Sequence, residues 1–184
     1  STGDSSMNKQ YQDEAVCLRK ISSADTAQIV AWRNSEFVRC GCIRQDPFTA
    51  DAHEKWLKNE VDTGHVAQFI LEDKILGRDV GSVYLRDIDP VSHKAEYGIF
   101  IGEKDACGRG IGTRATKLTL RYAFEVLKLH KVFLHVFAEN GSAIRSYEKA
   151  GFVQEGCFKD DVYRNGRYHD LLYMSVIDSS DRVL

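Results

Sequence analysis

Three glycines at alternate positions lead directly into a stretch with helical periodicity. Gly108, Gly110 and Gly112 are followed by apolar residues at steps of three or four, namely Ile111, Ala115, Leu118, Tyr122, Val126 and Leu129. This spacing places the apolar side chains on one face of a helix. Glycines ahead of a helix leave backbone N–H groups bare at the positive end of the helix dipole. The segment therefore predicts a docking place for a phosphate or pyrophosphate.

Two arginines beside these glycines, Arg109 and Arg114, could add charge-assisted hydrogen bonds to the same anion. A tight turn without a ligand is the alternative interpretation. Neither common nucleotide motif is met. Thr113 occupies the place where the dinucleotide fingerprint requires a further residue before its last glycine, and no Gly-Lys-Ser or Gly-Lys-Thr follows. The glycines alone do not decide the ligand.

The composition is that of an ordinary globular chain. It has 184 residues, 43% hydrophobic and 28% charged, which is enough for one domain with a real core. A net charge of −2 argues against a nucleic-acid binder that relies on bulk electrostatics. No membrane span or signal peptide is recognisable, and five cysteines without a CxxC pair fit reduced thiols. We expect a cytoplasmic protein with no nucleic-acid partner, no membrane contact and no metal site.

The chain reads as one domain over residues 13–178, with 1–12 as a disordered terminus or tag remnant and 179–184 as a tail. The expected strands are 15–21, 66–71, 79–86, 95–101, 131–137, 161–164 and 168–177. Helices are expected after the caps at Ser22–Asp25 and Thr49, after the glycine segment, and from Asn140 to Gly151. Asn165-Gly166 predicts a hairpin turn, 87–90 reads as a further turn, and Gly81 suggests a bulge or close backbone approach.

Three segments together carry a family resemblance. They are Glu96–Lys104 (EYGIFIGEK), Cys107–Thr113 (CGRGIGT) and Asn140–Phe152 (NGSAIRSYEKAGF). The chain resembles the GNAT superfamily of N-acetyltransferases from about Val16 to Ile177. Within it, the chain is most similar to the branch with ribosomal-protein, spermidine and nucleotide-amino-sugar acetyltransferases. The resemblance implies a single-domain α/β fold (an α+β mixed sheet): a central, mostly antiparallel sheet with splayed middle strands, flanked by helices.

The resemblance also implies acetyl-coenzyme A as co-substrate. Its pyrophosphate would lie on the N–H groups of 108–113, and its pantetheine arm would pair with the strand at 99–101. The implied donor-binding residues are Ile99, Phe100, Ile101, Cys107, Gly108, Arg109, Gly110, Ile111, Gly112, Thr113, Asn140, Ser142 and Arg145. Cys107 departs from the Gln or Arg that usually begins this loop, and it could be a reactive thiol or a packed cysteine. Asn140 could instead serve only as a helix cap.

Acetyl transfer requires a neutral amine, a polarised thioester carbonyl and a proton for the leaving thiolate. Tyr147, seven residues after Asn140, is the expected general acid, with a core-filling tyrosine as the alternative. Glu96 is the expected base, directly or through water, with a raised pKa among apolar neighbours, or else a structural carboxylate. A backbone N–H near Ile99 or Phe100 would polarise the carbonyl. An acetyl-Cys107 intermediate is the runner-up mechanism.

The acceptor is expected beside the first two helices, at Trp32, Arg33, Asn34 and Arg39, with Arg44 beyond. These arginines favour a small amine that carries an anionic group, such as a nucleotide-linked amino sugar. A peptide N-terminus and a polyamine are the enzymatic alternatives, and a solvated charged face with a core Trp32 is the structural one. A coenzyme A-binding sensor without turnover is the non-enzymatic alternative. A homodimer is possible, with the C-terminal hairpin as a candidate contact.

Overall fold

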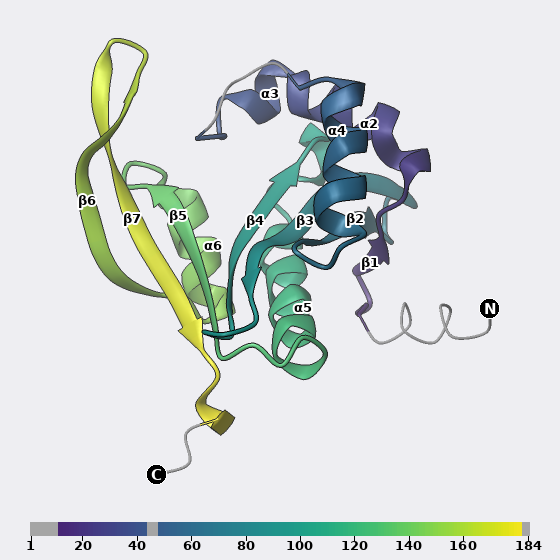
Figure 1. Ribbon diagram of the computed structural model, residues 1–184. Helices are drawn as coiled ribbons and strands as arrows, with labels where there is room; N and C mark the ends of the chain where they lie inside the picture. Colours follow the sequence, from purple (N-terminus) through teal and green to yellow (C-terminus); the bar gives the residue numbers. More distant parts are fainter. Residues whose placement is uncertain (1–10, 44–47, 182–184) are drawn as a thin grey trace.

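A seven-stranded sheet with helices on both faces forms the body of the protein (Figure 1). The computed structural model describes residues 11–43 and 48–181. The strand order is β1-β2-β3-β4-β5-β7-β6, and every neighbouring pair is antiparallel except β4 with β5. This is the mixed, mostly antiparallel α/β architecture that the resemblance implies.

The strands are β1 (Val16–Lys20), β2 (Ala67–Asp73), β3 (Arg78–Asp89), β4 (Lys94–Ile101), β5 (Lys131–Phe137), β6 (Val153–Arg164) and β7 (Arg167–Ile177). The helices are α2 (Thr26–Asn34), α3 (Glu36–Arg39), α4 (Ala50–Trp56), α5 (Ile111–Glu125) and α6 (Gly141–Ala150). Short turns of 3-10 helix occupy Ser23–Asp25, Lys104–Ala106 and Ser179–Asp181, and a π-helical turn occupies Leu57–Val61. Within the described ranges, no helix is long and apolar enough to cross a membrane.

Local signals in the sequence set the helix ends. Ser22 and Thr49 accept hydrogen bonds from backbone N–H groups in the first turns that follow them. Gly151 ends α6 in the left-handed region at φ 110°. Asn165 and Gly166 both have positive φ, 53° and 77°, as the tight hairpin turn requires. These predictions are confirmed because each depends only on residues a few positions apart.

Two hydrophobic clusters lie on opposite faces of the sheet. One packs Ile111, Ala115 and Leu118 of α5 against strand residues that include Tyr97 and Leu134. The other packs α2 against Phe100, with Ile29 and Trp32 among its buried members. Successive side chains of β4 alternate between the two faces. Its odd-numbered residues therefore face α5 and its even-numbered residues face α2.

The central strands β4 and β5 separate halfway along β4. Backbone pairing of β4 with β5 covers only Lys94–Glu96 against Lys131–Phe133. Beyond Glu96 the two strands diverge into the V-shaped opening visible in Figure 1. Among residues 11–43 and 48–181, the β5-facing edge of Tyr97–Ile101 thus has no strand partner, which is the splay that the resemblance implies. An extended group entering the opening could pair with this edge as an added strand would.

Gly81 lies where two backbones come unusually close. A Cβ at this position would be 2.2 Å from the carbonyl oxygen of Phe100. The register of β2 against β3 also shifts next to it, between Leu71 and Glu72. Both interpretations of this glycine, the bulge and the close approach, are confirmed.

Other boundaries differ from the sequence-based expectation. β3 continues through 87–89, where a turn was expected, because Asp87 takes a positive φ of 51° at an irregularity in its pairing with β4. β6 begins at Val153, eight residues early, since it is a largely exposed edge strand without a clear apolar alternation. Tyr11, expected in a loose terminus, is only 3% exposed and packs edge-on against Tyr122. The remaining termini, 1–10 and 182–184, lie outside the described residues.

Candidate active site

The glycine loop forms one wall of the site. Gly108 and Gly110 have φ of 79° and 77°, a region that disfavours any side chain. Gly110 is the N-cap of α5 and provides no side-chain cap, so the first N–H groups of this 15-residue helix stay uncapped. A Cβ built on either glycine would meet nothing within 4 Å. The loop therefore presents bare amides to open space, which fits a phosphate group.

A cleft of about 580 Å³ lies between this loop, the open edge of β4, α6 and residues 36–42, which are called the α3 segment below. Its size is that of a small-molecule site. The lining residues are Phe37, Val38, Gly41, Cys42, Ile99, Phe100, Ile101, Ala106, Cys107, Gly108, Gly110, Ile111, Gly112, Thr113, Thr116, Asn140, Ser142, Ala143, Arg145, Ser146, Tyr147 and Lys149. Most residues that the sequence assigned to the donor thus meet in one place. They come from three separate segments.

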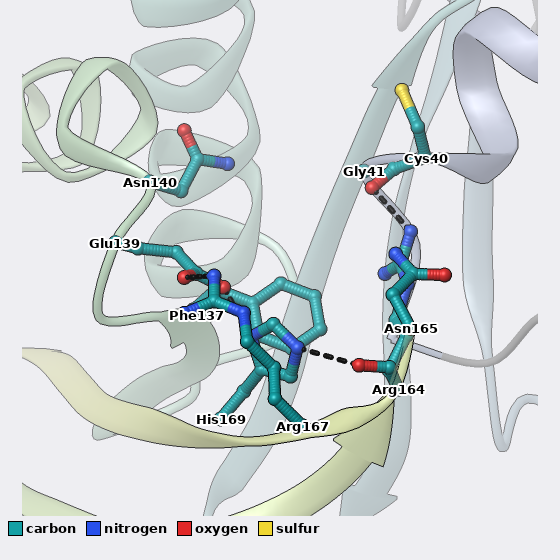
Figure 2. Close-up of a pocket in the computed structure, with 9 residues that line it drawn as sticks. All are labelled: Cys40, Gly41, Phe137, Glu139, Asn140, Arg164, Asn165, Arg167 and His169. Carbon is teal, nitrogen blue, oxygen red and sulfur yellow. Dashed lines mark hydrogen bonds and ion pairs between the residues drawn. The ribbon is translucent and has the colours of Figure 1, made fainter.

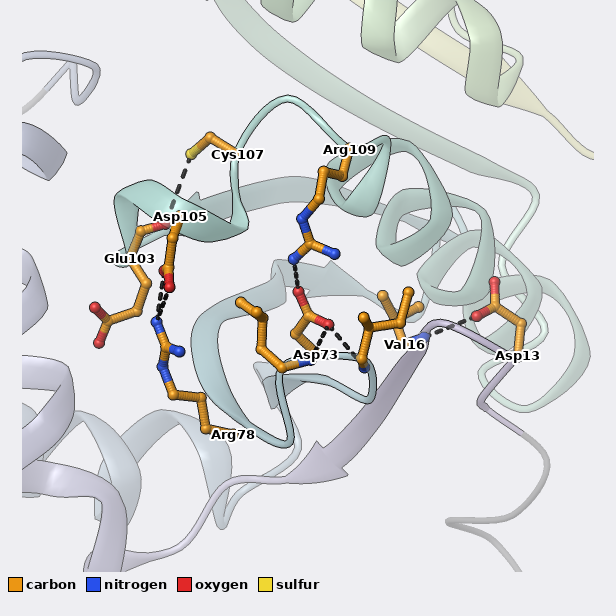
Figure 3. A network of polar contacts seen from close by, with 10 residues as sticks. Asp13, Val16, Asp73, Arg78, Glu103, Asp105, Cys107 and Arg109 are labelled. Carbon is orange, nitrogen blue, oxygen red and sulfur yellow. Dashed lines mark hydrogen bonds and ion pairs between the residues drawn. The ribbon is translucent and has the colours of Figure 1, made fainter.

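The two loop arginines are held elsewhere. Arg109 donates to the carboxylate of Asp73, whose side chain is fully buried (Figure 3). Arg114 binds Asp13 and Glu14 at 3.0 and 2.9 Å. Neither side chain lines the cleft. The two arginines instead make contacts that fasten the loop and α5 to neighbouring segments, and what the loop presents to the cleft is backbone amides.

Tyr147 of α6 lines the cleft, and its ring packs edge-on against Tyr97 and Phe152 of the core. Burial, with a smaller contribution from nearby Tyr84, raises the pKa of Tyr147 well above its ordinary value. The phenol therefore keeps its proton at neutral pH. A group that must supply a proton needs this protonation state.

Tyr84 reaches the same region from the other face of the sheet. It lies opposite Gly98 in the register of β3 with β4. A Cβ on Gly98 would be 2.2 Å from the Tyr84 ring, so the ring covers the space that this glycine leaves. Sequence reasoning missed Tyr84, although the hairpin register 84 to 98 could have paired it with the glycine.

Glu96 has two cationic or hydrogen-bonding partners. Arg86 donates from Nε to Oε2 at 2.7 Å, and His135 Nδ1 lies 3.0 Å from Oε1. Burial acts to raise the pKa of Glu96, but the hydrogen bonds from Arg86 and His135 outweigh it, so the pKa is lowered. The expectation of a raised pKa is wrong. The apolar neighbours in sequence do not reveal the partners that the sheet supplies from β3 and β5.

Cys107 lines the cleft and is exposed. Partial burial of its thiol, with a smaller effect of Asp105, raises the pKa of Cys107. Its S–H donates to the carbonyl of Glu103 at 3.8 Å (Figure 3). A raised pKa means less thiolate at neutral pH, which disfavours Cys107 as a nucleophile.

Asn140 caps α6, since its Oδ1 accepts from the N–H of Ala143 at 3.2 Å and from Ser142 Oγ at 3.3 Å. It lines the cleft as well, so the capping role and a ligand contact are compatible. Ser142 and Arg145 are exposed on the first turns of the same helix. Arg145 and Lys149 are the cationic side chains of the lining.

The residues expected to meet the acceptor are used for packing. Trp32 is buried and donates from Nε1 to Glu103 at 3.2 Å, as the structural alternative predicts. Arg33 stacks on Phe48 and Phe100, and Asn34 binds the backbone of Phe48 through both ends of its amide. None of these lines the cleft, nor does Arg39, and Arg44 lies outside the described residues. Phe37 and Val38 of α3 line it instead.

A smaller pocket of about 270 Å³ adjoins the cleft and shares Gly41 and Asn140 with it (Figure 2). Arg164 crosses this pocket and donates to the carbonyl oxygens of Cys42 and Cys40 at 2.8 and 2.6 Å. Glu139 binds both Arg167 and His169. No local pattern predicts this pocket, because it forms only where the β6–β7 hairpin meets the α3 segment.

Comparison with known proteins finds N-acetyltransferases. The family model described as "Acetyltransferase (GNAT) domain" matches residues 15–153. A spermidine N(1)-acetyltransferase of Vibrio cholerae is 32% identical over 162 residues, covering 88% of this chain and 92% of the relative. A putative ribosomal N-acetyltransferase of Bacillus subtilis, YdaF, is 28% identical over 173 residues, covering 90% and 92%.

Solved structures agree. The Vibrio cholerae spermidine N-acetyltransferase, crystallised with CoA and spermine, superposes with a TM-score of 0.82 at 28% identity. The match covers 91% of this chain and 98% of that one. A dodecameric structure of the enzyme from the same organism superposes with a TM-score of 0.77 at 28% identity, covering 91% and 96%.

Proposed function

The chain belongs to the GNAT family of acetyltransferases and is an acetyl-CoA-dependent N-acetyltransferase, and we propose that the cleft between β4 and α6 carries its reaction. The observation that carries this proposal is the meeting of three features in one cavity. They are the bare amides of the glycine loop, the unpaired edge of β4 and the phenol of Tyr147.

In this proposal the pyrophosphate of acetyl-CoA lies on the amides of 108–113, where a Cβ at Gly108 or Gly110 would fill the open space. The edge of Ile99–Ile101 binds the pantetheine arm, and Asn140, Ser142 and Arg145 contact it from α6. Bound acetyl-CoA supplies an activated acetyl group as a thioester. A backbone N–H near Ile99 or Phe100 donates to the thioester carbonyl as negative charge develops there.

Tyr147 is the proposed general acid. Its proton goes to the sulfur as the C–S bond breaks, so the leaving group departs as a neutral thiol. We propose direct transfer to the amine without an acetyl-cysteine, since the raised pKa of Cys107 leaves its thiol protonated.

For the acceptor we propose a polyamine. Support comes from the relatives, because the Vibrio cholerae proteins are named for spermidine and one was crystallised with spermine. A peptide N-terminus is the second candidate, supported by the ribosomal N-acetyltransferase relative. Both were alternatives in the sequence-based interpretation, and the relatives favour them over a nucleotide-linked amino sugar.

The test is a thiol-release assay with acetyl-CoA and a panel of acceptors. The panel contains spermidine, spermine, N-terminal peptides of ribosomal proteins and nucleotide-linked amino sugars. We expect the highest kcat/KM with a polyamine. A preference for peptides would favour the second candidate, and donor binding without turnover of any amine would support the sensor alternative.

We also propose self-association through the C-terminal hairpin. The hairpin exposes four large apolar side chains, each 46–66% exposed: Val153 and Phe158 of β6, and Tyr163 and Tyr168 at the hairpin tip. Since β6 is an edge strand, its outer backbone edge and these side chains suit pairing with another copy. The dodecameric relative supports assembly. Light scattering on a size-exclusion column tests it, with a monomer at all concentrations as the contrary outcome.

A further inference from the structure

An imidazole lies at the point where β4 and β5 separate. His135 follows Phe133, the last residue of β5 that pairs with β4, by two positions. It lies on the face of the sheet opposite α5, because Leu134 and Val136 on either side of it belong to the α5 cluster. Its Nδ1 is 3.0 Å from Oε1 of Glu96, whereas Nε2 has no hydrogen bond within residues 11–43 and 48–181.

Glu96 orients this imidazole, and its own carboxylate is fully occupied by hydrogen bonds. Its second oxygen, Oε2, accepts from Arg86 at 2.7 Å, so both oxygens have partners. The lowered pKa of Glu96 keeps it ionised at neutral pH, which makes it a poor proton acceptor. An ionised carboxylate beside Nδ1 favours the tautomer with the proton on Nδ1 and the lone pair on Nε2.

Several groups face His135 from the neighbouring strands. The ring packs against Phe133, Phe158 and Tyr173, with centroids 6.0, 5.8 and 5.4 Å away. The titratable and charged groups on this side include Glu96 of β4, backed by Arg86 of β3, and Lys94 of β4, which lies over the Phe133 ring. Tyr173 of β7 also faces the ring, and beside it lie Lys131 and its partner Glu155. The aromatic walls fix the plane of the imidazole while its side chain keeps 28% exposure.

The proposed reacting centre lies two residues beyond Glu96 on β4, beside Gly98. Tyr84 is two residues before Arg86 on the same face of β3, and its ring covers Gly98, two residues after Glu96. It is also close enough to Tyr147 to raise the pKa of that phenol. The Glu96–His135 pair and the proposed acid therefore lie on opposite faces of the sheet beside the separation of β4 and β5, and neither Glu96 nor His135 is among the residues that line the cleft.

We propose that His135 is the general base of the transfer, and that Glu96 is its positioning residue rather than the base. The inference rests on the proposed function. Nε2 of His135 takes a proton from the acceptor ammonium, and the freed nitrogen lone pair attacks the thioester carbonyl carbon. The C–N bond forms, the C–S bond breaks, and the sulfur receives the proton of Tyr147. The nitrogen then loses its second proton, which restores the phenol of Tyr147 through solvent, and the imidazolium releases its proton to solvent.

The activity test compares His135→Gln, Glu96→Gln and the control His65→Gln, which changes an exposed histidine. The readout is the pH profile of kcat/KM with the preferred amine. We expect His135→Gln to lose about 100-fold at neutral pH. Its profile should keep rising with the free-amine fraction where wild type has levelled off. We expect Glu96→Gln to lose a similar factor, and acetyl-CoA Kd to stay unchanged in all three. A wild-type profile in His135→Gln, with activity lost only in Glu96→Gln, would make Glu96 the base and overturn the inference.

A second measurement is independent of turnover and of variant folding. The ¹⁵N shifts of the His135 ring in the wild-type protein report which nitrogen carries the proton in the neutral form. We expect Nδ1–H, and an Nε2–H tautomer would overturn the inference. If wild type acetylates no amine while His135 shows Nδ1–H, the proposed function fails and the positioning by Glu96 stands.

Discussion

Arg109 of the glycine loop donates to the carboxylate of Asp73, a side chain with no exposed surface at the end of β2 (Figure 3). The same carboxylate accepts from the N–H groups of Ile75 and Leu76 at 2.9 and 3.0 Å. One buried carboxylate thus shapes the turn between β2 and β3 and fastens the loop to it. This contact holds the loop in the position from which its backbone amides face the cleft.

Replacing Asp73 by Asn should loosen the loop. The change leaves the guanidinium of Arg109 without its ionic partner, and we expect a loss of about 1–3 kcal/mol in the free energy of unfolding. The Kd of acetyl-CoA should rise several-fold while kcat changes less. Chemical denaturation and calorimetric titration measure the two effects. Asp105→Asn, which removes an exposed pair with Arg78, is the matched control. An unchanged Kd in Asp73→Asn would contradict a role in holding the loop.

The same carboxylate predicts a pH dependence of stability. Burial acts to raise the pKa of Asp73, but hydrogen bonds from Leu76, Arg109 and Ile75 outweigh it and lower the pKa. The folded pKa lies below the unfolded one, so this contribution is present above about pH 4 and is lost as pH falls through the folded value. Asp73→Asn should show a shallower acid-side loss of stability than wild type. Parallel curves for the two proteins would refute this.

Gly110→Glu should abolish acetyl-CoA binding, since its side chain would project a negative charge into the open space above the amides. Gly64→Glu is the control, because Gly64 has a comparable φ of 83° and likewise open surroundings but lies outside the cleft. Both variants carry similar backbone strain, about 1–2 kcal/mol. Calorimetric titration should then separate them, with binding lost only in Gly110→Glu. Equal affinities would remove the loop from the donor site.

Tyr147→Phe should lower kcat about 100-fold with little change in acetyl-CoA affinity, because it removes a proton and keeps the ring packing. Tyr122→Phe, in the core beside Tyr11 and Phe69, is the control. Since the pKa of Tyr147 is raised, wild-type kcat should show no alkaline decline from this group below about pH 10. Steady-state kinetics across pH measure both. Equal losses in kcat and affinity would speak against the acid role.

Arg164→Ala should detach the β6–β7 hairpin from the α3 segment, because Arg164 makes the hydrogen bonds to Cys40 and Cys42 that join them (Figure 2). Phe37 and Val38 line the cleft from that segment, so we expect KM for the amine to rise several-fold with acetyl-CoA affinity retained. Arg167→Ala, which removes a more exposed arginine of the same hairpin, is the control. If Arg164→Ala leaves the KM for the amine unchanged, the contact has no role in shaping the acceptor side.

Local chemistry let the sequence predict much of this protein. The glycines before α5, the caps at Ser22, Thr49 and Asn140, and the Asn165-Gly166 turn each depend on residues within a few positions of one another. For that reason the order of strands and helices, the bare glycine loop before α5 and the place of Tyr147 on its helix were all predictable, and the motifs they form indicated the family.

Only the tertiary structure decided which charges meet. Arg109 is 36 residues from Asp73, Glu96 is 39 from His135, and Trp32 is 71 from Glu103. Strand register and the packing of loops against the sheet bring such partners together. The pattern of neighbouring residues in the sequence does not indicate them. Electrostatic energy depends on distance in space, so the ionisation of Glu96 and the role of Arg109 were fixed by the fold.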